Sequence, residues 1–194
     1  MQDRAVASFD PQADRNPDAI RIVRLDGAAA QAAVPALAEV LIDCVEGGAS
    51  VSFMLPISPA TALAFWRGVA DAVGRGERVL LVAEDGASGR IVGTVQLILS
   101  LPENQPHRAD VAKMLVHRTA RRRGVAQGLL AAVEVAARGS KRTLLVLDAV
   151  TGGDAYRLYS RSGWQRAGDV PGYALMPDGQ PCGTTFFYRR LDAA

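Results

Sequence analysis

The segment Arg121-Arg122-Arg123-Gly124-Val125-Ala126-Gln127-Gly128, residues 121–128, joins a predicted strand over 109–116 to a predicted helix over 125–138. Small residues at 124, 126 and 128 leave the first turn of that helix almost without side chains. Four backbone N–H groups lack partners at a helix start, and the helix dipole is positive there. Such an end can hold a phosphate or pyrophosphate, and Arg118 and the arginines at 121–123 can add charge-assisted hydrogen bonds. The alternative is a helix that simply begins beside glycine, with solvated arginines.

Strands and helices alternate on both sides of this turn. Asp26 is a predicted cap for the first helix, and Pro35 inside that helix predicts a late start or a kink. The segment TLLVLD is continuously apolar, which is typical of a central strand covered on both faces. The order predicts a mixed sheet with helices on its faces. We expect extended segments over 19–25, 78–84, 91–101, 109–116, 143–148, 164–170 and 183–191, and helices over 28–46, 58–73, 125–138 and 153–161.

A second motif follows the strand at 143–148, in the segment Ala155–Trp164. Together the two motifs resemble the GNAT superfamily of acyl-CoA-dependent N-acetyltransferases. Its signature pairs an R/Q-x-x-G-x-G/A turn with a later A-x-x-x-Y-x-x-x-G-[FWY] helix. This sequence supplies Arg121-x-x-Gly124-x-Ala126 and Ala155-x-x-x-Tyr159-x-x-x-Gly163-Trp164. The resemblance covers about residues 20–191, and the phrases GGASVSFM (47–54) and PGYALMPDG (171–179) are most similar to the tabtoxin-resistance type.

This resemblance implies a fold and a co-substrate. The fold is α/β (α+β), GNAT-like, with a mixed, mostly antiparallel central sheet of six to seven strands flanked by about four helices. The co-substrate is acetyl-CoA, without a metal. The turn departs from the usual R-G-x-G-x-G at Arg122 and Ala126, and Gly152 stands where an Asn is common. The residues implied in cofactor binding are Met114, Leu115 and Val116 along the pantetheine arm, and Arg121, Arg122, Arg123, Gly124, Val125, Ala126 and Gln127 around the pyrophosphate.

The family motif places Tyr159 as the acid for the departing CoA thiolate. A phenol with a reference pKa near ~10 is a sensible proton source for a thiolate whose thiol has a pKa near ~8.5. Tyr156 lies on the same helix face but has the wrong spacing to Gly163. The alternative for Tyr159 is a packed core tyrosine with a solvated hydroxyl.

A protonated amine acceptor needs a base before it can attack a thioester. Asp110 and Asp148 are the candidates, because each lies where a predicted strand reaches the expected cleft. In the alternative interpretation they cap turns or pair with Arg108 and Arg142. Two histidines, His107 and His117, are further candidates, although His117 is expected to be solvated.

Composition and charge limit the number of domains, the chemistry of the cysteines and the location that we expect. The 194 residues predict one domain over 20–194 behind a mobile N-terminal arm at 1–19. With 49% apolar and 22% charged residues the chain is globular. Cys44 and Cys182 are too few for a disulfide framework or a zinc cluster, and neither has a His pattern for a ping-pong route. Since no apolar leader or long apolar run is present, we expect a cytoplasmic protein without membrane attachment.

The leading functional hypothesis is an N-acetyltransferase acting on a primary amine of a small molecule by direct attack in a ternary complex. Toxins, antibiotics, polyamines, amino acids and protein N-termini all stay open as acceptors. A CoA-binding sensor or subunit without catalysis is the alternative. The net charge of +2 and four clustered arginines without interleaved aromatics argue against nucleic acid as a partner. The oligomeric state stays open, with the terminal strands and tail as candidate surfaces for a homodimer.

Overall fold

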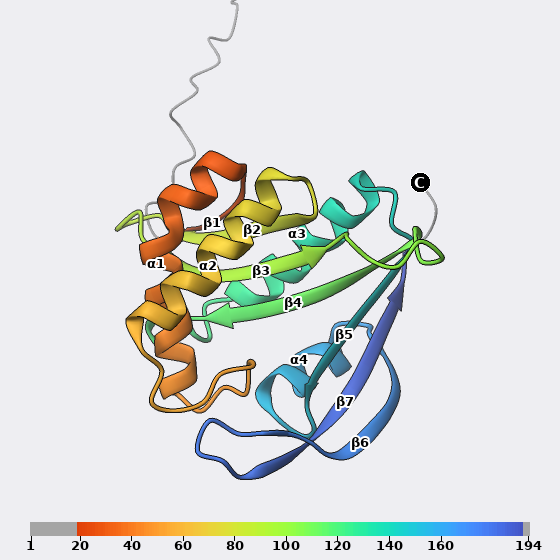
Figure 1. Ribbon diagram of the computed structural model, residues 1–194. Coiled ribbons are helices and arrows are strands. Elements are labelled where there is room, and N and C mark those ends of the chain that lie inside the picture. Colours follow the sequence, from red (N-terminus) through yellow and green to blue (C-terminus); the bar gives the residue numbers. More distant parts are fainter. Residues whose placement is uncertain (1–18, 192–194) are drawn as a thin grey trace, which may run out of the picture.

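The structure is a computed structural model, of which residues 19–191 are described, so the arm predicted at 1–19 lies outside the described residues except for Ala19. One sheet of seven strands runs through it in the order β1-β2-β3-β4-β5-β7-β6 (Figure 1). The only parallel pair is β4 with β5; every other neighbouring pair is antiparallel. The elements are β1 Ile20–Leu25, α1 Gly27–Glu46, α2 Pro59–Gly74, β2 Arg78–Asp85, β3 Ile91–Ile98, β4 Arg108–Val116, the 3₁₀ turn η1 Arg118–Ala120, α3 Val125–Gly139, β5 Leu144–Val150, α4 Asp154–Arg161, β6 Gln165–Leu175 and β7 Pro181–Arg190.

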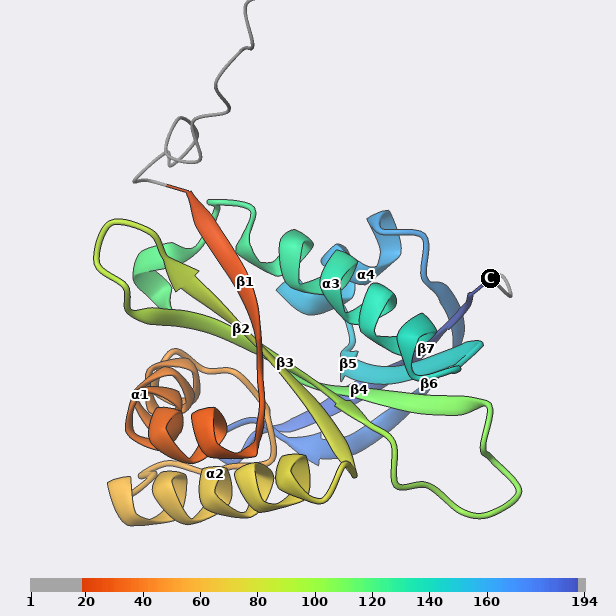
Figure 2. The ribbon, with the colours of Figure 1, turned by 90° about the horizontal axis from the view of Figure 1, so that it is seen from above.

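The helices cover the two faces of the sheet in pairs. Figure 2 shows α1 and α2 on one face and α3 and α4 on the other. Each face has its own apolar core, since alternate strand residues point to opposite sides. Trp66, Leu37 and Leu41 fill the α1/α2 side, and Leu129, Leu145 and Phe187 fill the α3/α4 side. The mixed, mostly antiparallel sheet with four α-helices that the resemblance implied is therefore the observed fold.

Helix α1 departs from its prediction at Pro35. The Asp26 side chain caps the helix by accepting a hydrogen bond from the amide of Ala29 at 2.8 Å. From there α1 runs without a break through Pro35 to Glu46, so the predicted late start is wrong. Pro35 lies on the exposed face, where water can bind the carbonyl that proline leaves without a partner. By length and composition α1 is also apolar enough to cross a membrane, but its apolar face packs into the α1/α2 core.

Strand β6 is longer than the predicted segment at 164–170. It continues through Pro171 to Leu175, with register shifts against β7 at Arg166/Gly168 and Val170/Ala174. A proline is tolerated there because β6 is the edge strand of the sheet and its outer side has no partner strand. The added length carries the β6–β7 hairpin beyond the end of β5. The hairpin can thus reach the loop between α1 and α2.

Candidate active site

The strands β4 and β5 separate in the middle of the sheet. Only Arg108–Asp110 of β4 pair with Leu144–Val146 of β5, and within the described chain the two strands share no pairing beyond that point. Figure 1 shows β4 and β5 diverging from this paired end. We call the opening between 111–116 of β4 and 147–150 of β5 the seam. An edge of β4 that should bond to a neighbouring strand is thereby left for a ligand.

A bulge in β4 decides which backbone groups face the seam. Between Gln96, which pairs with Ala112, and Thr94, which pairs with Leu115, strand β4 contains one residue more than β3. The amide of His117 donates to Val92 on β3 at 2.8 Å. Since the direction of backbone groups alternates along a strand, Leu115 also faces β3, while Met114 and Val116 face the seam. The bulge therefore separates the three predicted pantetheine residues into two that face the seam and one that holds β4 to β3.

The turn before α3 exposes backbone amides. Gly124 has φ +76° and caps the helix without a side-chain hydrogen bond, and the first bond to its carbonyl comes from Gly128 at 3.0 Å. The amides of Val125, Ala126 and Gln127 precede that bond and have no partner within the helix. A Cβ added at Gly124 would meet no atom of the described residues within 4 Å, apart from its chain neighbours, so the space beside its Cα is open. These amides fit an anionic diphosphate.

The arginines around this turn brace it rather than converge on one point. Arg118 binds Asp43 of α1, Arg121 donates to the carbonyl of Val116 at 3.4 Å, and Arg123 pairs with Asp85 at 2.7 Å. The amide of Arg121 already donates to the carbonyl of Arg118 at 3.4 Å. The guanidinium groups of these three arginines are therefore engaged with protein groups, and phosphate binding at this turn stays a prediction that now rests on the backbone amides further along it.

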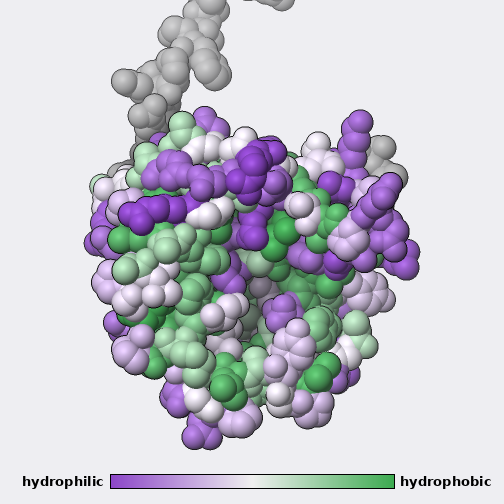
Figure 3. Space-filling model, in the orientation of Figure 1, coloured by the Kyte–Doolittle hydropathy of each residue, from purple (hydrophilic) through white to green (hydrophobic). Residues whose placement is uncertain are grey.

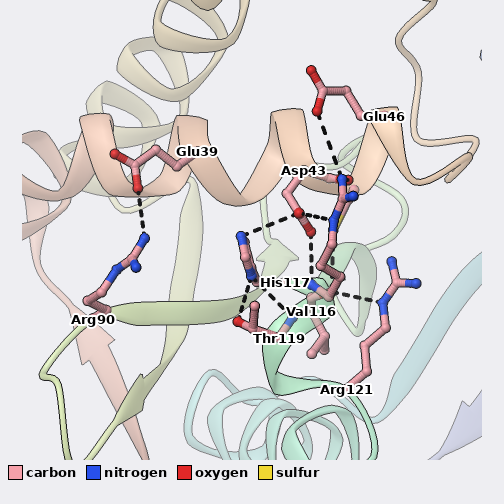
Figure 4. Close-up of polar contacts among 10 residues, drawn as sticks. Glu39, Asp43, Glu46, Arg90, Val116, His117, Thr119 and Arg121 are labelled. Carbon is pink, nitrogen blue, oxygen red and sulfur yellow. Dashed lines mark hydrogen bonds and ion pairs between the residues drawn. The ribbon is translucent and has the colours of Figure 1, made fainter.

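Asp43 is a site residue that the sequence analysis missed. Its carboxylate accepts the amide of Arg118 at 2.8 Å, contacts the guanidinium of Arg118, and lies 3.4 Å from Nε2 of His117 (Figure 4). His117 also bonds to Thr119 at 2.8 Å, so it is held rather than solvated as expected. The available signal was one acidic residue in an otherwise apolar stretch of α1, because a buried carboxylate needs a partner.

Asp85 anchors the other side of the same turn. Its carboxylate accepts from the Arg123 guanidinium and from the amide and hydroxyl of Ser88. The hydrogen bond from Arg123, followed by those from Ser88, lowers the pKa of Asp85 to about 2. The carboxylate therefore stays charged over the neutral range, and the turn is tied to both α1 and the β2–β3 hairpin.

Tyr159 lies across the seam in the α3/α4 core. The side chain is buried, with ring centroids 5.6 Å from Trp164 and 5.9 Å from Phe187. Burial, together with the negative charge of Asp148, raises the pKa of the Tyr159 phenol. The phenol consequently holds its proton at neutral pH, which a general acid must do before the reaction. It is packed as a core residue and is also close enough to Asp148 to sense its charge.

The two predicted carboxylates share one face of the sheet. The neighbours of Asp110 and Asp148 along their strands are buried in the α3/α4 core, so both aspartates point to the α1/α2 face. Asp110 is ion-paired with Arg108 at 2.7 Å, which is the pairing that the alternative interpretation named, and its role as a base stays a prediction. Burial and the charge of Asp148 nevertheless raise the pKa of Asp110, against the opposing effect of Arg108. Arg142 instead bonds to the carbonyl of Leu99 and does not pair with Asp148.

Two loops meet over this face of the seam. The hydroxyl of Ser50 donates to the carbonyl of Leu175 at 2.8 Å. The amide of Leu55 donates to the carbonyl of Pro177 at 2.9 Å. The molecule is hollowed between α2 and the β5–β7 region, with apolar residues along the rim (Figure 3). The α1–α2 loop and the β6–β7 hairpin thus contact each other. Large apolar side chains exposed on them are Met54, Leu55, Val170, Tyr173 and Leu175.

Comparisons with known proteins agree with this geometry. Residues 76–166 match the family described as acetyltransferase (GNAT) domain. A putative acetyltransferase from Salmonella typhimurium, solved with acetyl-CoA, is 19% identical with a TM-score of 0.73, covering 90% of this chain and 95% of its own. A ribosomal-protein-alanine N-acetyltransferase from Brucella melitensis is 24% identical with a TM-score of 0.71, covering 88% and 99%. A putative phosphinothricin N-acetyltransferase is 18% identical with a TM-score of 0.73, covering 90% and 99%.

The chain therefore has the GNAT acetyltransferase fold, and the matched segment runs from the start of β2 to the start of β6. That segment contains the seam, the amide-rich turn and Tyr159. Segments outside it include α1 with Asp43, the α1–α2 loop and the β6–β7 hairpin.

Proposed function

We propose that this protein is an N-acetyltransferase that moves an acetyl group from acetyl-CoA to a primary amine of a small molecule. The observation that carries the proposal is the continuity of the seam. The edge of β4 at Met114 and Val116, which pairs with no described strand, leads to the open amides at the start of α3. Tyr159 lies on the α3/α4 face of the sheet, whereas Asp148, beside the seam, and Asp110, at its paired end, lie on the α1/α2 face.

Each end of the seam fits one part of acetyl-CoA. The amides of Val125, Ala126 and Gln127 fit the diphosphate, and the seam-facing backbone of Met114 and Val116 fits the amide groups of the pantetheine arm. The carbonyl of Val116 already accepts from Arg121 at 3.4 Å and from the thiol of Cys44 at 3.5 Å, and both are long, weak bonds that an amide of the pantetheine arm can replace. Bound acetyl-CoA supplies the thioester whose carbonyl carbon the amine attacks.

The side chains then divide the proton transfers between them. A carboxylate, Asp148 or Asp110, accepts the proton of the ammonium acceptor directly or through water. The neutral amine forms the new N–C bond, and the C–S bond breaks as Tyr159 gives its proton to the sulfur. The remaining extra proton on the nitrogen then passes to the Tyr159 phenolate, directly or through water, which leaves a neutral amide, the CoA thiol and a neutral phenol. Asp148 is the better candidate for the base, because Asp110 is engaged with Arg108 while the carboxylate of Asp148 is exposed.

A direct route is also favoured by the state of Cys44. Its thiol is buried and donates to the carbonyl of Val116 at 3.5 Å, and burial raises its pKa. A neutral, buried thiol is a poor nucleophile at neutral pH. We therefore propose attack by the amine itself on the thioester, without an acetylated cysteine.

The tabtoxin-resistance type and a role in detoxification also belong to this proposal. They rest on the segments at 47–54 and 171–179, which form the two contacting loops. One neighbour of similar fold is described as acting on ribosomal protein alanine and another as a putative phosphinothricin acetyltransferase, so both classes of acceptor are represented among chains of this fold. A cytoplasmic site of action fits the use of acetyl-CoA.

The test combines binding with turnover. Acetyl-CoA should raise the melting temperature, because a ligand that binds only the native state stabilises it. A broad panel of amines should then reveal CoA release, monitored with a thiol reagent. Saturable binding of acetyl-CoA without transfer to any amine supports the alternative of a CoA-binding sensor. Failure to bind acetyl-CoA contradicts both functions.

A further inference from the structure

Lys113 is a half-buried cation with neutral partners only. Its Nζ donates to the hydroxyl of Ser52 at 3.0 Å and lies 5.6 Å from the ring centroid of Phe65. Among residues 19–191 no carboxylate lies within ion-pair distance of it. Burial lowers its pKa, and the charge of Asp148 opposes that change. A charge withdrawn from water without a counter-ion is costly, so this ammonium is prepared for an anion that arrives from outside.

The backbone fixes the position of this ammonium. Lys113 occupies the β4 bulge with φ +50°, and Ser52 has φ +77° in the α1–α2 loop. Both are conformations that L side chains other than Asn and Asp rarely adopt, and such residues persist only where the surrounding structure holds them. The loop that presents Ser52 is fastened to the β6–β7 hairpin on either side, at Ser50 and Leu55.

More donors surround Lys113 on the same face of the sheet. Arg78 is half-buried and donates to Oε1 of Gln96 at 2.6 Å, and it forms no ion pair with any described residue. Gln96 is fully buried, and its Nε2 has no acceptor within the described part of the chain. Gln96 pairs with Ala112, the residue just before Lys113, and Arg78 lowers the pKa of Lys113. This part of the site is therefore rich in donors and poor in acceptors.

Asp148 carries the charge opposite to that of Lys113 on the same face of the sheet, without contacting it. Asp148 is close enough to Lys113 to influence its pKa, yet the two form no ion pair. A site with a cation and a carboxylate held at separate points is complementary to a molecule that carries both charges. The ammonium of such a molecule would face Asp148 and its anionic group would face Lys113.

From this arrangement we infer that the acceptor is a small zwitterionic amine, whose carboxylate or other anionic group is bound by the Lys113 ammonium with the Ser52 hydroxyl. The inference rests on the proposed acetyltransferase function and adds the substrate class to it. Lys113 acts here in acceptor specificity and transfers no proton.

The experiment compares matched acceptors in matched variants. L-amino acids and their amides form pairs that share an amine and differ in one negative charge. Lys113→Met removes the ammonium, whereas Lys141→Met removes the same charge from an exposed turn residue that also has positive φ, +57°. Both variants thus keep a non-glycine residue in the same type of backbone conformation. Steady-state CoA release gives kcat/KM for each pair.

We expect the wild-type protein to favour the acids over their amides by at least ~10-fold. Lys113→Met should lower kcat/KM for the acids by roughly 10- to 100-fold and change that for the amides by less than ~3-fold. Lys113→Arg should retain much of the preference, and Lys141→Met all of it.

Other outcomes distinguish a failure of this inference from a failure of the proposed acetyltransferase function. Equal use of acids and amides by the wild-type protein, or a preference that survives Lys113→Met, overturns the inference and leaves acetyl transfer standing. Absence of transfer to every amine, with acetyl-CoA still raising the melting temperature, overturns the catalytic function and this inference with it. Thermal melting of each variant reports whether the substitution has disturbed the fold.

Discussion

The carboxylate of Asp43 on α1 accepts a hydrogen bond from the backbone amide of Arg118 at 2.8 Å and contacts the guanidinium of the same residue. A residue outside the matched family segment thus holds the start of the turn that leads to α3. Arg118 lies between β4 and the open amides, so its placement affects both of the segments to which we assign acetyl-CoA. The contact between Asp43 and Arg118 therefore couples α1 to the turn before α3.

Asp43→Ala should weaken both the fold and the binding of acetyl-CoA. Loss of the carboxylate leaves a partly buried amide and part of a guanidinium without an acceptor, which costs about 1–3 kcal/mol and lowers Tm by ~3–10 °C. We expect KM for acetyl-CoA to rise by roughly 5-fold or more, because Arg118 and the turn that follows it are no longer held in place by Asp43. Glu39→Gln is the control on the same helix, since its pairing with Arg90 at 3.3 Å is exposed. Equal effects of the two substitutions would show that Asp43 has no special role.

Gly124→Ala tests the open turn at the start of α3. The added methyl meets no described atom within 4 Å, so the direct cost is the positive φ of +76°, about 1 kcal/mol. The same methyl stands beside the amides that we assign to the diphosphate, and we expect Kd for CoA to rise by roughly 10-fold. Gly139→Ala, at the end of the same helix and also in open space, is the control. Calorimetric titration with CoA measures both, and unchanged affinity in Gly124→Ala places the diphosphate elsewhere.

The sequence predicted the elements near the two motifs more closely than the parts that join them. The turn and α3 follow from glycine and alanine spacing, and the strand at 143–148 follows from its apolar run, because local chemistry determines both. Continuation of β6 through Pro171 depends on its place at the sheet edge, and the unbroken α1 depends on the exposure of Pro35. Neither the place of β6 at the sheet edge nor the exposure of Pro35 follows from the local sequence.

The residues of the candidate site also divide into those that a local pattern predicts and those that only distant contacts bring together. Tyr159 was found through its spacing to Gly163, whereas the bracing partners Asp43 and Asp85 lie 75 and 38 residues away from the arginines they bind. No short-range pattern connects such pairs. The neutral surroundings of Lys113 likewise arise only when the α1–α2 loop is brought over β4.

Acid should remove the tie between Asp85 and Arg123. The pKa of Asp85 is about 2 in the folded protein against an ordinary value of 3.8, so the unfolded chain binds more protons between these values. Stability from this carboxylate is fully present above about pH 4 and is lost as the pH falls toward 2. Urea unfolding of the wild type and Asp85→Asn over pH 2–6 should converge at the acid end. A constant difference between them across that range contradicts the assigned shift.

Tyr159→Phe tests the proton donor on the far side of the seam. We expect kcat to fall by about 10²-fold, because removal of a general acid costs at least that much, with little change in KM for acetyl-CoA. The fold should be retained, since the ring contacts with Trp164 and Phe187 do not involve the hydroxyl. Tyr156→Phe is the matched control on α4, where the ring packs 5.4 Å from Phe187. Full turnover by Tyr159→Phe assigns the acid role to another group.

Asp148→Asn and Asp110→Asn together identify the base. If Asp148 accepts the proton of the ammonium, its substitution should lower kcat/KM at pH 7 by roughly 10²-fold. The loss should shrink as the pH rises toward the pKa of the amine, since more of the acceptor is then already neutral in solution. Asp110→Asn should instead act mainly through its partner Arg108, with a loss that does not depend on pH in this way. The pH profile of kcat/KM for the two variants distinguishes these cases, and a pH-dependent rescue seen only in Asp110→Asn transfers the role of base to Asp110.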